Sequence, residues 1–147
     1  MTAAPKFEFV DRVTSDLSFV ARGARVEDVF AASAEALLAA TLEDPATVAA
    51  REHRSLTLEE PELELLLLRF LNELIYWRDA EQLLLRTETL RIRRDAAVRL
   101  EARLAGERID PERHRLEGDV KAATAHDLQV RQRNGDGGWE AAVTLDV

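Results

Sequence analysis

Cysteine is absent from this chain of 147 residues. Its absence excludes disulfides, thiolate metal sites and cysteine nucleophiles. A chain without cysteine suits a reducing compartment, so we expect a cytoplasmic location. Long apolar runs are missing as well, since none reaches the roughly 18 residues of a membrane-spanning helix. We therefore expect no membrane association.

Basic residues are fewer than acidic residues in this chain. The chain has 20 lysines and arginines against 28 acidic residues, a net charge of −8 and a pI near 5.0. A protein whose main task is to grip nucleic acid usually carries a basic face, so we expect no direct nucleic-acid binding. One stretch, residues 85–104, carries six arginines. We interpret them as solvent-facing strand residues that balance nearby acids, with a local basic patch as the alternative.

Motifs of catalysis are also missing. The sequence has no Ser/His/Asp pattern, phosphate-binding loop or zinc-ligand spacing, and the glycines of residues 135–138 are too few for a nucleotide loop. The three histidines, His53, His114 and His126, are far apart in sequence. Without a nucleophile–base pair we predict that the protein is not itself an enzyme.

The residues that are present predict an α+β fold. Apolar residues make up 46% of the chain and charged residues 33%, which suits one domain with one core, spanning residues 1–147. Alternating patterns predict strands over 6–13, 17–23, 49–60, 83–95, 96–109, 120–133 and 139–147. Helical spacing predicts helices over 25–44 and 62–84, with a loop at 110–119, a turn at 134–138 and a bulge near 125–127. We thus expect two helices packed on a mostly antiparallel sheet of about six to seven strands.

Two carboxylates stand at strand ends, Asp16 at the start of the second strand and Asp146 at the end of the last. Calcium and magnesium prefer clusters of oxygen ligands, and an aspartate beside a terminal carboxylate supplies them. The pattern alone does not bring residues 16 and 146 together. A solvent-exposed pair without a metal is therefore the alternative interpretation.

Four segments together resemble, in order and spacing, the archease family. They are FVDRVTSDLSFVARG (9–23), RFLNELIYWRDAEQLL (69–84), DPERHRLEGDVKAATAHDLQV (110–130) and GGWEAAVTLDV (137–147). The resemblance implies a small α+β protein that activates an RtcB-type RNA-splicing ligase. That ligase uses GTP and a divalent metal, through a guanylylated histidine, to join RNA ends. The family member promotes guanylylation and turnover and carries no ligase chemistry itself.

The resemblance also assigns a metal site. Asp16 matches the aspartate of an HTAD-like motif and Asp146 the penultimate aspartate, while Val147 would contribute its carbonyl or terminal carboxylate. The expected cofactor is a divalent cation, calcium first, with magnesium or manganese as alternatives. The histidine that precedes the threonine in the family is missing. Allowing a one-residue insertion, Asp11 takes the acidic position of the family motif.

Lys121, His114 and Asp11 are the candidate partner contacts that the resemblance suggests. Lys121 would meet a nucleotide phosphate or an acidic ligase residue as a point charge. For His114 we prefer a loop residue that hydrogen-bonds its own backbone. A competing function is a general chaperone or scaffold for RNA-processing enzymes without a metal role. The oligomeric state and the RNA substrate of the ligase stay open.

Overall fold

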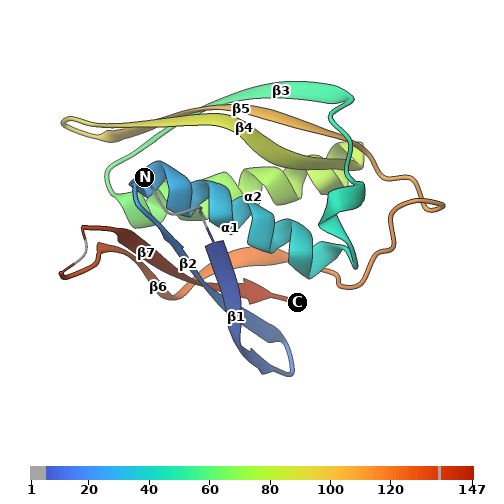
Figure 1. Cartoon of the computed structure of the whole chain (residues 1–147), viewed down its shortest axis with the longest axis horizontal. Coiled ribbons are helices and arrows are strands. Elements are labelled where there is room, and N and C mark those ends of the chain that lie inside the picture. Colours follow the sequence, from blue (N-terminus) through green and yellow to red (C-terminus); the bar gives the residue numbers. More distant parts are fainter. Residues whose placement is uncertain (1–5, 136) are drawn as a thin grey trace.

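Two antiparallel sheets enclose a layer of helices in the computed structural model, which describes residues 6–135 and 137–147. The first sheet contains β1 (Lys6–Val13), β2 (Asp16–Gly23), β7 (Trp139–Asp146) and β6 (Ala122–Gln132), in that order. The second contains β3 (Glu52–Glu60), β5 (Val98–Arg108) and β4 (Leu83–Arg94), in that order. The helices α1 (Val26–Thr41) and α2 (Leu63–Glu81) lie between the two sheets (Figure 1).

The predicted α+β class is confirmed: the described residues form two long helices and seven strands, every pair antiparallel. The strands are divided between two sheets instead of being joined in one. The physical reason lies in α1, whose buried residues Val26, Ala32 and Leu38 lie on different sides of the helix. A helix that is apolar around most of its surface needs cover on both sides.

The first helix ends three residues before the predicted end. Leu42 is extended, with φ −119°, and forms a bridge with Leu116 of the long loop. Asp44 then starts a short 3-10 turn, Pro45–Thr47, by accepting a hydrogen bond from the N–H of Ala46. The expected loop at 110–119 thus pairs with the chain that follows α1.

The second helix is shorter than the predicted range of 62–84. It ends at Gln82, which adopts the left-handed conformation with φ 58°. Leu83 and Leu84 belong to β4 instead, where they pair with Arg108 and Glu107. An apolar run suits a buried helix and a buried strand equally well, so periodicity alone does not separate them.

One hydrophobic core joins both sheets to the helices. Phe30 of α1 and Phe70 of α2 are fully buried, with ring centroids 6.0 Å apart. Phe19 of β2 and Leu100 of β5 close the core from the two sheets, each with no exposed surface. Each such side chain contributes about 1.5–3 kcal/mol by burial. The shared core makes the two sheets one folding unit.

Two bulges interrupt the first sheet. One lies in β1 between Phe9 and Asp11, and the other in β6 between Thr124 and Gln129. The second confirms the bulge expected near 125–127. Residues 1–5 of the predicted domain and Asp136 of the predicted turn lie outside the described residues. Of the helices in the described parts, none combines the length and apolar character that crossing a membrane requires.

Arg86 connects β4 by hydrogen bonds to the first helix and to the residues that follow it. Its guanidinium donates to both carboxylate oxygens of Glu35, at 3.1 and 3.3 Å, and to the carbonyls of Pro45 and Val48, both at 3.1 Å. A lysine side chain has a single ammonium group, which cannot reproduce the hydrogen bonds that the planar guanidinium donates in several directions. We expect Arg86→Lys to lower the free energy of unfolding by about 1–2 kcal/mol in urea titration. Arg91→Lys, on the same strand, is the control and should stay within about 0.5 kcal/mol.

Candidate metal centre

The two aspartates singled out by the sequence lie side by side. Asp16 and Asp146 are direct cross-strand partners in the ladder between β2 and β7, the two central strands of the first sheet. Their neighbours Leu17 and Leu145 are buried in the core. Because side chains alternate along a strand, both aspartates occupy the outward face. Opposite residues have Cβ atoms about 4.5–5.5 Å apart, so the carboxylates are close neighbours.

Backbone hydrogen bonds hold the end of the last strand from two sides. The N–H of Val147 donates to the carbonyl of Ser15 at 2.9 Å, and the N–H of Lys121 donates to the carbonyl of Asp146 at 2.8 Å. The Val147 side chain packs against the core. Residues 146 and 147 therefore have a fixed place next to Asp16.

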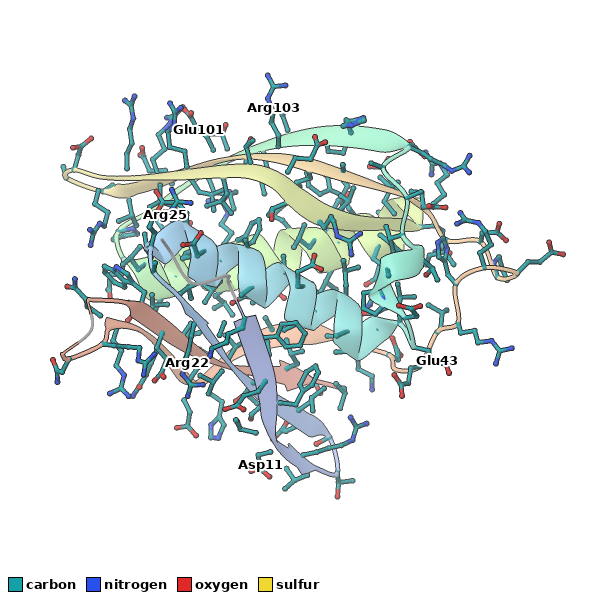
Figure 2. The ribbon with its side chains drawn as sticks, viewed as in Figure 1. Asp11, Arg22, Arg25, Glu43, Glu101 and Arg103 are labelled. Atoms are coloured by element: carbon teal, nitrogen blue, oxygen red, sulfur yellow. The ribbon has the colours of Figure 1, made fainter. Side chains whose placement is uncertain are left out.

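The bulge in β1 places a third carboxylate on the same face. Asp11 lies opposite Ser18, which is two residues beyond Asp16 on β2. Phe9 lies opposite Phe19, whose side chain is buried in the core, so an unbroken strand would turn residue 11 toward that inner side. The extra residue, Val10, turns the side chain of Asp11 to the outward face instead. Figure 2 shows Asp11 on the β1–β2 hairpin, on the side of the molecule away from the second sheet.

The three carboxylates lack cationic partners. Within residues 6–135 and 137–147, the side chains of Asp11, Asp16 and Asp146 take part in no ion pair or side-chain hydrogen bond. Glu140, at the other end of β7, differs. Its partial burial would raise its pKa, but hydrogen bonds from Arg22 and Arg131 outweigh that effect, and the pKa of Glu140 is lowered. One end of the face is balanced by arginines, and the other is left negative.

This donor set fits a hard divalent cation. Like charges placed directly opposite each other destabilise a sheet, and a cation between Asp16 and Asp146 would remove that repulsion. Calcium takes six to eight oxygen ligands. In the described part of the chain no three His, Asp or Glu side chains converge on one point. The side chains alone would therefore fill only part of a coordination shell, and main-chain oxygen, water or a partner would have to supply the rest.

Lys121 and His114 have very different settings. Lys121 is exposed and adjoins Asp146 through its backbone hydrogen bond. His114 is 2% exposed, and its Nδ1 accepts a hydrogen bond from the N–H of Asp110 at 2.8 Å. Its Nε2 lies 3.5 Å from a carboxylate oxygen of the buried Glu107. This geometry supports the preferred interpretation of His114 as a loop residue bonded to its own backbone.

No pattern in the sequence pointed to the residue of α2 that supports this site from the helix layer. Asn72 of α2 donates to the carbonyl of Ala123 at 3.1 Å and accepts from the N–H of the same residue at 2.9 Å. Arg78, from the same helix, donates to the carbonyl of Val120. Asn72 and Arg78 thus hold residues 120–123 in place. The N–H of Lys121, within this segment, donates to the carbonyl of Asp146. The one available hint was an amide within the apolar stripe of α2.

Comparisons with known proteins agree over almost the whole chain. Residues 7–147 match the model of the Archease protein family. The protein archease of Thermococcus gammatolerans is 35% identical over 135 residues, which cover 91% of this chain and 94% of the relative. That of Methanosarcina mazei is 31% identical over 145 residues, covering 97% and 96%. The solution structure of Methanobacterium thermoautotrophicum protein 1598 superimposes with a TM-score of 0.81 at 31% identity, covering 96% of this chain and 98% of that one. The chain therefore belongs to the archease family.

Proposed function

We propose that this protein is an accessory activator of an RtcB-type RNA ligase, with no ligase chemistry of its own. It promotes guanylylation of the ligase and repeated turnover. The observation that supports the proposal is the pairing of Asp16 with Asp146 in a chain that matches the archease family over residues 7–147. The family match supports the class of protein. The paired carboxylates support a cation site through which the protein would act on the ligase.

In this proposal Asp16, Asp146 and Val147 hold a divalent cation, calcium first, with magnesium or manganese as alternatives. The cation supplies positive charge that binds phosphate or carboxylate oxygens. The central strands β2 and β7 keep the two carboxylates opposite each other. Lys121, beside Asp146, offers a mobile point charge to a nucleotide phosphate or an acidic ligase residue. Asp11, on the same outward face, is a further contact for the ligase.

The unbalanced acidic face suits such a partner. An RNA ligase needs a basic active site to hold RNA, and complementary charge speeds the encounter of two proteins. The carboxylates without cationic partners gather at one end of the first sheet, next to the β1–β2 hairpin. That end is the part of the molecule that would face the ligase.

A chaperone or scaffold without a metal role is the second candidate, and one observation favours it. Phe9, Val10 and Val13 on the edge strand β1 are 40%, 52% and 57% exposed. Exposed apolar residues that gather on one strand are typical of protein contact sites. A chaperone would depend on these residues and tolerate the loss of Asp16. An activator that acts through a cation would show the reverse.

The experiment measures guanylylation of an RtcB-type ligase by labelled GTP, with this protein added and without it. We expect the protein to raise the rate on the order of tenfold, a typical size for coupling between two sites. Asp16→Ala should abolish the increase. The variant Val10→Ser with Val13→Ser should retain most of it. No increase with the wild-type protein would refute the proposal, and the opposite order of the variants would favour the chaperone.

A further inference from the structure

The outward face of the second sheet carries a group of arginines. Arg91 and Arg93 on β4 and Arg99 and Arg103 on β5 are all exposed. The residues between them, such as Leu100, point into the core. Alternation thus places all four guanidinium groups on one side of the sheet, and we call this surface the arginine face. Its position differs from the acidic end of the first sheet: Figure 2 shows Arg103 on the outer side of the second sheet and Asp11 at the opposite side of the molecule.

Three of these arginines form no ion pair within the described residues, although Glu101 lies opposite Arg91 and Glu59 lies opposite Arg99 in the strand ladders. The three are Arg91, Arg93 and Arg103, in a chain where acids outnumber bases by 28 to 20. Arg99 pairs with Glu101 at 3.4 Å. Arg93 and Arg99 are direct cross-strand partners. Like charges directly opposite each other destabilise a sheet, and a bound anion would relieve that cost.

A hollow adjoins the arginine face and extends to the start of α1 and to Leu56, Leu90 and Ala102. This hollow of about 620 Å³ is lined by Arg25, Arg91 and Arg103, together with Glu27 and Glu101. Hydroxyl groups of Ser55, Thr57 and Thr89 line it too. Guanidinium and hydroxyl groups are the donors that proteins direct at phosphate oxygens. The hollow thus combines positive charge with neutral hydrogen-bond donors.

The spacing suits a chain of phosphates better than a single one. Side chains two residues apart on one strand face, such as Arg91 and Arg93, are about 6.6 Å apart along the strand. Successive phosphates of an extended nucleic-acid strand are similarly spaced. The outward positions of β3, β4 and β5 in the arginine face hold no aromatic side chain, so bases have nothing to stack on. The acidic end of the first sheet is screened, because the Debye length is about 8 Å at physiological salt.

We propose that the arginine face binds the phosphate backbone of an RNA strand, without reading its sequence. The choice of RNA among polyanions rests on the proposed function, since an RNA ligase brings RNA to its activator. The net charge of −8 predicted no contact with nucleic acid, and the separation of charge between the two sheets is what changes that expectation. An activator with this arrangement holds the ligase at its acidic end and the RNA at the opposite face.

The test is fluorescence anisotropy of a labelled, unstructured 20-nucleotide RNA with the isolated protein. The variant Arg91→Gln, Arg93→Gln, Arg103→Gln removes the three unpaired charges. A control, Arg51→Gln, Arg69→Gln, Arg115→Gln, removes the same charge elsewhere on the surface. We expect the first triple variant to weaken RNA binding at least tenfold and the control less than threefold. The slope of log K against log salt should fall by about 2, or about 0.7 for each lost phosphate contact.

A second measurement separates this proposal from the proposed function. The guanylylation assay with labelled GTP is run without RNA, so the first triple variant should stimulate it as the wild type does. Equal RNA binding by the wild type and this variant, or equal loss in the control, would overturn the RNA site. Lost stimulation with unchanged RNA binding would also overturn it, because the arginine face would then dock a protein. If even the wild type fails to stimulate the ligase, the proposed function fails while the RNA result stands.

Discussion

We expect calcium to stabilise the wild-type protein, and we expect replacement of Asp146 with asparagine to abolish that stabilisation. A ligand that binds the folded state at a concentration one hundred times its Kd adds about 2.7 kcal/mol. For a chain of 147 residues this corresponds to a rise in Tm of roughly 5–10 °C. The variant keeps the shape of the side chain and loses its charge, so we expect a rise below 1 °C. Thermal unfolding in calcium and in EDTA measures both.

The same substitution should have the opposite effect when metal is withheld. In EDTA the carboxylates of Asp16 and Asp146 repel each other across the β2–β7 ladder. Cross-strand pairs of this kind change stability by about 0.2–1 kcal/mol. Asp146→Asn should therefore be slightly more stable than the wild type in EDTA. A residue that serves only the fold would not gain stability when it is neutralised.

Glu140→Gln is the matched control, because Glu140 lies on the same face of the same strand. Arg22 and Arg131 both form ion pairs with it, at 2.8 and 3.1 Å. Its pKa is lowered in the folded state, so its carboxylate stabilises the fold above the unfolded pKa, and that gain disappears as the pH falls through the folded pKa. At pH 7 the variant should lose stability in EDTA and keep its response to calcium. A full calcium response in Asp146→Asn would refute the metal site.

Local patterns predicted the elements of this fold but not their assembly. Alternation and helical spacing identified both helices and all seven strands, since each depends on neighbouring residues only. The division into two sheets depends on which strands pair. β5 pairs with β3 and β4 and leaves the other four strands to the first sheet. The end of α2 depends on Gln82, whose left-handed conformation has no clear signal in its residue type.

The metal site could be predicted from the sequence only through the resemblance to the archease family. No pattern joins Asp16 to Asp146, because they meet by strand pairing between the two ends of the described chain. The outward position of Asp11 depends on the bulge beside Val10, and one extra residue in an alternating strand leaves an ambiguous pattern. The sequence predicts that nearby acids balance the arginines of β4 and β5, but within the described residues Arg91, Arg93, Arg94 and Arg103 form no ion pair.

Asn72 offers the sharpest test of how the fold supports the site. Asn72→Leu should lower the free energy of unfolding by about 2–4 kcal/mol, because the N–H and the carbonyl of Ala123 both lose their partner in a half-buried place. Leucine retains most of the side-chain volume. Glu73→Leu, one residue along α2 and without a hydrogen bond among the described side chains, should change stability by less than about 0.5 kcal/mol.

Hydrogen exchange distinguishes the local loss of the Asn72–Ala123 hydrogen bonds from a loss of stability in the whole fold. The amide of Ala123 donates to Asn72, so Asn72→Leu should speed its exchange more than that of the core strand β5. Loosening of residues 120–123 should extend through the bond between Lys121 and Asp146 and weaken calcium binding severalfold. Equal loss of protection in β5 would mean that Asn72 stabilises the whole fold without positioning the site. Unchanged calcium affinity would mean that β2 and β7 alone keep Asp16 and Asp146 together.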